Sequence, residues 1–181
     1  TRDFAGTAVL VFQPAEEGLG GARTMIADGL FEKFPCDEIY GMHNNPNGLP
    51  GHVSVKPGAA MAGACFFDIT VHGIGSHAAM PQAGRDSIVI ASALVGELQS
   101  IVSRNVAPTK PAVLSVTTFN SGNAYNVVPA TATLTGTVRY FHDEVRELIE
   151  TRIREICAGM AKMHGIEIDV KIWNVFDVLK N

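Results

Sequence analysis

The fold is decided by residues 130–173, ATATLTGTVRYFHDEVRELIETRIREICAGMAKMHGIEIDVKIW. Ala130 to Tyr140 has the composition of a strand. Asp143 to Met163 repeats apolar residues at helical spacing, with Asp143 as the expected N-cap and His164-Gly165 as the stop. The apolar stripe of this helix comprises Val145, Leu148, Ile149, Ile153, Ile156 and Cys157. We therefore expect the helix to pack on a sheet that includes a last strand, Ile166 to Trp173.

A matching set of elements precedes this stretch. Phe66 to His72 predicts a strand, Asp86 to Ser103 an amphipathic helix, and Ala112 to Thr118 a further strand. The combined order is strand, helix, strand, strand, helix, strand, which is the order of the ferredoxin-like split βαβ fold. We predict a four-stranded antiparallel sheet with two helices.

The beginning of the sequence predicts a different architecture. Gly6 to Phe12 is continuously apolar, as in a strand covered on both faces; Gly20 to Leu30 has helical spacing, and Glu38 to His43 predicts a second strand. One βαβ unit cannot bury both faces of its sheet, so we interpret it as part of an incomplete α/β domain with exposed apolar surface.

The predicted class is thus α/β (α+β), with a boundary at the Pro57-Gly58 pair. The expected parts are residues 1–57, a partial α/β domain; residues 58–174, the ferredoxin-like domain; and residues 175–181, a tail.

Composition excludes several classes of function. The chain has 181 residues, 46% of them hydrophobic, and a net charge of -4, which gives no basic footprint for nucleic acid. We expect no membrane span, because apolar stretches are broken short of about 18 residues. Thr1-Arg2-Asp3-Phe4 does not resemble a signal peptide, so a cytoplasmic setting is expected. The three cysteines form no C-x-x-C pair and are interpreted as packed, reduced thiols.

A pair of adjacent carboxylates, Glu16-Glu17, follows the first expected strand in Gln13-Pro14-Ala15-Glu16-Glu17-Gly18. The carboxyl ends of strands are where open α/β sheets bind ligands. A divalent cation on one carboxylate would leave the other as a general base for a water molecule. The alternative is a charge pair favoured by the dipole at a helix N-terminus.

His43 ends the neighbouring expected strand in Met42-His43-Asn44 and can reach the same crevice. Imidazole and carboxylate are suitable ligands for zinc or manganese. A polar residue without a task is the alternative for a single histidine at a strand end.

These motifs, together with Gly73-Ile74-Gly75-Ser76-His77-Ala78-Ala79-Met80-Pro81, Asn126-Val127-Val128-Pro129 and Gly136-Thr137-Val138-Arg139, resemble the M20 metallopeptidase family. The similarity covers nearly the whole chain, in the family's order. The nearest branch is that of hippurate hydrolases, N-acyl-amino-acid amidohydrolases and auxin-conjugate hydrolases. The resemblance implies metal-dependent hydrolysis of the amide bond of an N-acyl amino acid or small peptide.

The resemblance also implies roles for six residues. Glu16 would be the general base, and Glu17 and His43 metal ligands in the catalytic domain. His77 would reach from the lid domain, 58–174, into a partner's site and donate to the oxyanion. Asn126 and Arg139 would contact the substrate carboxylate. Without the resemblance, His77 is a loop histidine and Arg139 a solvated charge.

Two departures from the family's pattern bear on activity. The upstream His-x-Cys or His-x-Asp element and the further C-terminal histidine that hold the family's two ions are not found in these residues. Zinc or manganese, or else cobalt or nickel, is therefore expected to bind weakly or not at all, because catalytic zinc normally keeps about three protein ligands. We expect a trimmed or shortened chain with little or no activity of its own, and a homodimer through the lid domain. The alternative function is a non-catalytic dimerisation module.

Overall fold

The computed structural model describes residues 5–16 and 20–181 of the chain. Its internal contacts divide the chain into two compact units, Thr1–Val55 (unit 1) and Lys56–Asn181 (unit 2). Unit 1 contains the short helices α1 (Gly21–Ala27) and α2 (Leu30–Lys33). Unit 2 contains β1 (Ala59–Met61), β2 (Gly63–His72), β3 (Ser76–His77), the 3-10 turn η1 (Pro81–Ala83), α3 (Ser87–Ser100), the π-helical turn η2 (Ile101–Asn105), β4 (Ala112–Ser121), β5 (Val127–Val128), β6 (Thr131–Tyr140), α4 (Asp143–His164), β7 (Glu167–Phe176) and β8 (Leu179–Lys180).

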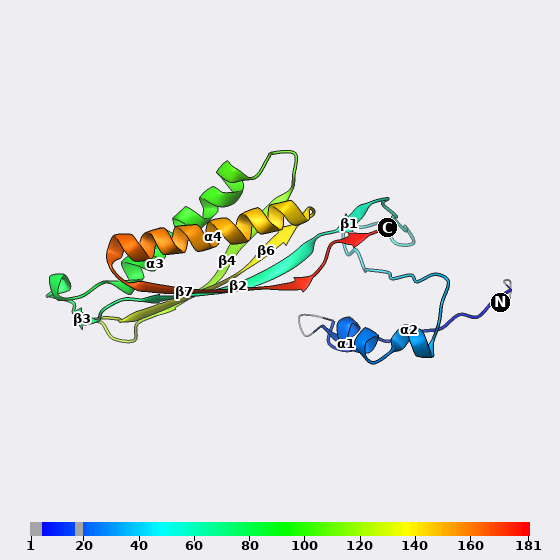
Figure 1. The fold of residues 1–181 in the computed structure, drawn as a ribbon, viewed down its shortest axis with the longest axis horizontal. Helices are drawn as coiled ribbons and strands as arrows, with labels where there is room; N and C mark the ends of the chain where they lie inside the picture. Colours follow the sequence, from blue (N-terminus) through cyan, green and yellow to red (C-terminus); the bar gives the residue numbers. More distant parts are fainter. Residues whose placement is uncertain (1–4, 17–19) are drawn as a thin grey trace. The chain divides into compact units, whose positions relative to one another are not determined.

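The main sheet of unit 2 has the strand order β4-β6-β2-β7, and every neighbouring pair is antiparallel. Helices α3 and α4 lie together on one of its faces (Figure 1). The order strand, helix, strand, strand, helix, strand confirms the predicted ferredoxin-like fold.

The core of unit 2 lies between this sheet and the two helices. Alternate residues of β2, among them Cys65, Phe67 and Ile69, are completely buried against the helices, while the residues between them face the open side of the sheet. The helices contribute Ile90, Ala91, Leu94 and Leu98 from α3 and Val145, Ile149, Ile153, Cys157 and Met160 from α4. The stripe predicted for 143–163 is thus the buried face of α4.

The two long helices begin differently. Asp86 caps α3, because its carboxylate accepts from the amides of Ile88 at 2.9 Å and Val89 at 3.2 Å. The expectation that Asp143 caps α4 is wrong: His142 is the N-cap residue and makes no side-chain capping bond. Asp143 is instead the first helical residue, where its charge still complements the helix dipole. The predicted stop is confirmed by Gly165, whose φ of 62° is left-handed.

One helix of the described residues, Ser87–Asn105, is long and apolar enough to cross a membrane by length and composition alone. The helix contains Gly96, Glu97 and Arg104, so its apolar residues are not continuous over that length. Its buried residues, Ile90, Leu94 and Leu98 among them, pack into the core of unit 2, as in the core helix of a globular domain.

Residues 175–181 are more ordered than the predicted tail. Val175 and Phe176 complete β7, and β8 pairs with β1. Gly58 and Asn181 exchange two backbone hydrogen bonds of 3.2 and 3.0 Å. The two ends of unit 2 therefore lie side by side in one two-stranded ribbon.

The two strands predicted in unit 1 do not form. Residues 7–13 and 38–45 are in neither strand nor helix, and Phe12 and Met42 are 84% and 92% exposed. A strand requires a partner for its backbone groups, and the described residues of unit 1 contain no strand to pair with. Only the helical part of the expected βαβ unit is present, as α1 and α2.

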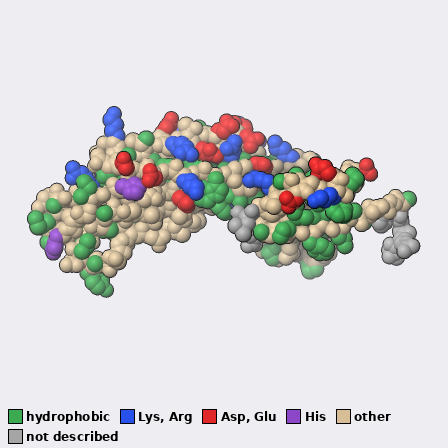
Figure 2. Space-filling model, turned by 60° about the horizontal axis from the view of Figure 1, so that its bottom comes forward, with side chains coloured by type: hydrophobic (Ala, Val, Ile, Leu, Met, Phe, Trp, Pro, Cys, Tyr) green, Lys and Arg blue, Asp and Glu red, His purple; other side chains and the backbone are tan. Residues whose placement is uncertain are grey.

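The solvent side of α4 carries charges of both signs. Arg146 pairs with Glu150 at 3.0 Å, and Arg152 contacts Glu155 one turn later. On the face drawn in Figure 2, acidic and basic side chains are interspersed. The Arg146–Glu150 pair is half-buried, whereas the exposed Arg152–Glu155 pair adds little to stability, so the buried face of α4 anchors the helix.

Candidate functional site

Glu16 and His43, two of the predicted site residues, lie in unit 1; Glu17 lies outside the described residues. Glu16 is exposed and follows Ala15, whose φ of 49° lies in the left-handed region. That conformation costs an alanine roughly 1–2 kcal/mol.

The ring of His43 is oriented by the next residue. Its Nδ1 lies 2.7 Å from the carbonyl oxygen of Asn44. A carbonyl oxygen can only accept, so Nδ1 carries a proton, and in the neutral ring Nε2 then keeps its lone pair. This second interaction is typical of metal-binding histidines. The described residues nevertheless contain no group of three or more His, Cys, Asp or Glu side chains that could hold a metal ion.

His77 and Asn126 lie close together in unit 2. His77 in β3 pairs with Val127 in β5, and the amide of Ala78 donates to the carbonyl oxygen of Asn126 at 2.9 Å. The buried Ser87 at the start of α3 fixes the same segment by donating from Oγ to the carbonyl oxygen of Pro129 at 2.9 Å. Both His77 and Asn126 are exposed. We call this end of unit 2 the tip.

Arg139 lies at the opposite end of β6, eight positions beyond Thr131. At about 3.3 Å per residue, that separation is about 26 Å. Its Nη1 donates to Thr137 Oγ1 and, at 3.4 Å, to the carbonyl oxygen of Val138. The structure therefore brings His77 and Asn126 together and separates both from Arg139 of the same chain.

Arg139 borders a hollow of about 380 Å³ on the open face of the sheet that the sequence did not indicate. Phe66 and Trp173 form its apolar part, with ring centroids 6.0 Å apart in an edge-to-face arrangement. These two residues lie on β2 and β7, and only the strand pairing brings them together. No local pattern could have revealed the contact.

A family model described as a peptidase dimerisation domain of the M20 type matches residues 60–163, more than half of the chain. The chain belongs to the M20 peptidase family. The match covers the sheet from β2 to β6 and both long helices, so unit 2 is the family's dimerisation domain.

Curated relatives of this M20 chain include a hippurate hydrolase and an N-acetyldiaminopimelate deacetylase. A hippurate hydrolase from Campylobacter jejuni is 47% identical over 170 residues, which are 94% of this chain and 44% of that protein. An N-acetyldiaminopimelate deacetylase from Streptococcus sanguinis is 38% identical over 164 residues, 91% of this chain and 44% of that protein. The chain thus spans less than half the length of these relatives.

Two solved structures have a similar fold. A candidate aminohydrolase from methicillin-resistant Staphylococcus aureus is 31% identical with a TM-score of 0.85, covering 93% of this chain and 45% of that one. A Bacillus subtilis protein, described as a dinuclear metal-binding peptidase of the M20 family, is also 31% identical, with a TM-score of 0.71 over 94% of this chain and 41% of that one.

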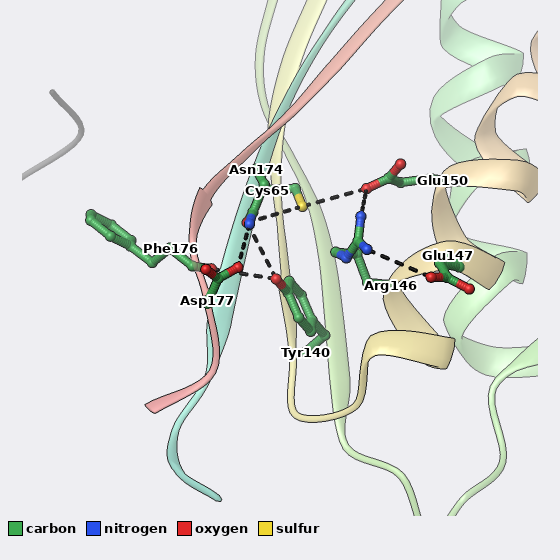
Figure 3. A network of polar contacts seen from close by, with 8 residues as sticks. All are labelled: Cys65, Tyr140, Arg146, Glu147, Glu150, Asn174, Phe176 and Asp177. Carbon is green, nitrogen blue, oxygen red and sulfur yellow. Dashed lines mark hydrogen bonds and ion pairs between the residues drawn. The ribbon is translucent and has the colours of Figure 1, made fainter. Parts of the chain in front are cut away.

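A polar network closes the end of the M20 domain opposite the tip (Figure 3). Asn174 Oδ1 accepts from the hydroxyl of Tyr140 at 3.2 Å, and Asn174 Nδ2 donates to Asp177 at 2.6 Å. The thiol of Cys65 points to Glu150 and Asn174. Burial, with the charge of Glu150 next in effect, raises the pKa of Cys65 from 9.0 to about 11. Burial likewise raises the pKa of Tyr140 from 10.0 to about 12.

This network predicts a loss of stability in alkali. In the unfolded chain, Cys65 and Tyr140 have their ordinary pKa values of 9.0 and 10.0, so they lose their protons at a lower pH than in the folded chain. The unfolded state therefore binds fewer protons in this range, and the unfolding free energy falls as pH rises. We expect urea unfolding to show full stability below pH 9 and a progressive loss as pH approaches 11 to 12. Over this pH range, the unfolding free energy of the Tyr140→Phe variant should fall less than that of the unmodified chain. An equal fall would contradict the assignment of the effect to Tyr140.

Proposed function

We propose that the chain is the part of an M20 amidohydrolase that carries the water-activating carboxylate and the lid, and that the enzyme cleaves N-acyl amino acids. The 47% identity to a hippurate hydrolase over 94% of the chain carries this proposal. The names of both curated relatives denote amides on the nitrogen of an amino acid, with a benzoyl group in one and an acetyl group in the other. The shared substrate class is an N-acyl amino acid with a free carboxylate.

The proposed chemistry assigns one task to each residue. Glu16 takes a proton from the attacking water. His77 donates a hydrogen bond to the negative charge that develops on the carbonyl oxygen. Asn126 and Arg139 bind the substrate carboxylate, for which a guanidinium offers a two-pronged donor.

The distance along β6 requires two copies of the chain for these tasks. In an N-acyl amino acid, the scissile carbonyl and the carboxylate are separated by only a few bonds. Arg139 lies about 26 Å along β6 from Thr131, and His77 lies beyond Thr131, beside β5, so His77 and Arg139 of one chain cannot both contact the same small substrate. The proposal is therefore that His77 and Asn126 of one chain act with Glu16 and Arg139 of another, in a homodimer.

A divalent metal, zinc or manganese or else cobalt or nickel, belongs to the proposal through the dinuclear M20 relative. His43 has its Nε2 lone pair available, and Glu17 lies outside the described residues. The described residues do not by themselves assemble a metal site. We therefore expect the 181 residues alone to show little or no turnover.

A hybrid enzyme tests the proposal. The 170-residue segment of the Campylobacter jejuni hippurate hydrolase that aligns with this chain is replaced by this chain, and hippurate hydrolysis is measured with added zinc or manganese. We expect metal-dependent hydrolysis by the hybrid and none by the hippurate hydrolase lacking the segment. A folded hybrid that hydrolyses neither hippurate nor other N-acyl amino acids would leave the non-catalytic dimerisation module as the better account.

The homodimer is proposed to form along β4, one of the two edges of the sheet. β4 contains no Lys, Arg, Asp or Glu, whereas the opposite edge, β7, carries Glu167, Asp169 and Lys171. Charged side chains are a usual protection of an edge strand against pairing. The uncharged edge is therefore the one available to a second copy, in agreement with the matched dimerisation domain.

Lysines on β4 should abolish this association. Val113 and Thr118 are exposed and face the open side of the sheet. In a two-fold pairing of β4 strands, Val113→Lys with Thr118→Lys would place like charges against each other. We expect the unmodified chain to sediment at twice its mass of 19.3 kDa, the double variant as a monomer, and the β7 control Asp169→Lys as a dimer. A monomeric unmodified chain, or a dimeric double variant, would contradict the β4 interface.

A further inference from the structure

A backbone amide two residues further along the chain holds the ring of His77 by a hydrogen bond. The backbone amide of Ala79 donates to Nδ1 of His77 at 3.1 Å. A backbone N–H can only donate, so Nδ1 must present its lone pair to it. In the neutral ring, the proton is then on Nε2.

The rest of the turn leaves the ring little freedom. The three successive amides after His77 all hold this segment: Ala78 donates to the carbonyl oxygen of Asn126, Ala79 to the His77 ring, and Met80 to the carbonyl oxygen of His77 at 2.8 Å. A side chain at Gly75 would lie 3.1 Å from the carbonyl oxygen of Val128, so the strands approach closely here. The hydrogen bond to the ring thus belongs to a turn that is fixed on both sides.

We infer that the Ala79 amide is a positioning group that holds His77 as the Nε2–H tautomer. His77 then presents a donor, and no acceptor, at the ring nitrogen that is free. Through Nε2 it can stabilise negative charge on an oxygen, but it can neither take a proton from water nor bind a metal. His43 is held in the opposite way, with its proton on Nδ1. The mechanistic use of this donor rests on the proposed function; the tautomer does not.

Nuclear magnetic resonance tests the inference on the chain itself, without activity. Long-range proton–nitrogen correlation, at a pH where imidazole is neutral, separates a protonated ring nitrogen from one with a lone pair. We expect His77 to show a fully unprotonated Nδ1, and a scalar coupling between this nitrogen and the amide nitrogen of Ala79. His72 is the positive control, because its Nε2 lies 2.9 Å from a carboxylate oxygen of Asp169 and must carry the proton. His52, with no side-chain hydrogen bond among the described residues, should show averaged nitrogens.

Two variants test the effect of the Ala79 amide on the His77 tautomer. Ala79→Pro removes the N–H and should shift His77 to the averaged pattern of His52, while Ala79→Gly keeps the N–H and should keep the His77 signature. The amide signals of β2 and β6 report whether the domain stays folded. Averaged His77 nitrogens in the unmodified chain would overturn the inference, even if Ala79→Pro does not fold, and so would an unchanged His77 in a folded Ala79→Pro. Failure of the hybrid to hydrolyse amides, with the tautomer as stated, would count against the proposed function alone.

Discussion

Replacement of Phe67 by alanine is expected to lower the unfolding free energy of the chain by about 3–5 kcal/mol. Phe67 is fully buried between the sheet and the helices. Its ring lies directly over Gly136 of β6, where an added Cβ would be 2.2 Å from Phe67 Cζ. The glycine and the ring are therefore complementary, and removal of the ring leaves a cavity that no neighbour fills. Since small domains are stable by only about 5–15 kcal/mol, urea unfolding should detect the change readily.

The adjacent Phe66 provides the matched control. It has the same side chain on the same strand, but it faces the open side of the sheet and contacts Trp173 edge to face. Such an aromatic pair contributes about 0.5–1.5 kcal/mol beyond the area that it buries. Phe66→Ala should therefore cost clearly less than Phe67→Ala. Equal losses would mean that the helices do not cover the face that the structure assigns to them.

Glu16→Gln in the hippurate hydrolase hybrid is expected to lower kcat on the order of 10²- to 10⁴-fold. The substitution keeps the size and hydrogen-bonding ability of the side chain, but an amide cannot accept the proton of the attacking water. The exposure of Glu16 is consistent with access to a substrate. Steady-state hydrolysis of hippurate at saturating metal measures the effect.

Glu32→Gln is the control for this substitution. Glu32 lies in the first turn of α2, in the same unit, and is assigned no chemistry. It should leave kcat within a few-fold of the unmodified hybrid. If Glu16→Gln also retains nearly full activity, Glu16 is not the base, and the charge pair favoured by a helix dipole becomes the better interpretation of Glu16 and Glu17.

Unit 2 could be predicted from the sequence because its signals are long and periodic. The stripe from Val145 to Cys157 and the stop at Gly165 require only local spacing, and the observed α4 agrees with both. The pairs β1–β8 and β3–β5 could not be predicted. Each of these strands has only two or three residues, too few for a periodic pattern, and depends on partners distant in sequence.

The error in unit 1 has the opposite cause. Gly6 to Phe12 has the composition of a buried strand, but composition specifies what a strand would bury and does not supply its partner. The cap of α4 is a smaller error of the same kind: the Asp143 side chain suits a cap, but the backbone geometry places the N-cap one residue earlier, at His142.

Part of the candidate site could likewise be predicted from the sequence, and part could not. The motifs that contain His77 and Asn126 identified residues that the structure brings together at the tip. The sequence gave no sign that Arg139 is at the far end of β6, because the separation follows from strand direction and register. That separation is the physical reason to place one active site across two copies of the chain.

The most direct test of the shared site is complementation between two inactive hybrids, one with Glu16→Gln and one with His77→Ala. In a mixed dimer, the site that combines an intact Glu16 with the partner's intact His77 has both groups, and the other site has neither. With random exchange of subunits in a two-fold dimer, we predict that an equal mixture regains about a quarter of the hippurate hydrolysis of the unmodified hybrid. A mixture that stays as inactive as its two components, although sedimentation shows that mixed dimers form, would contradict the account.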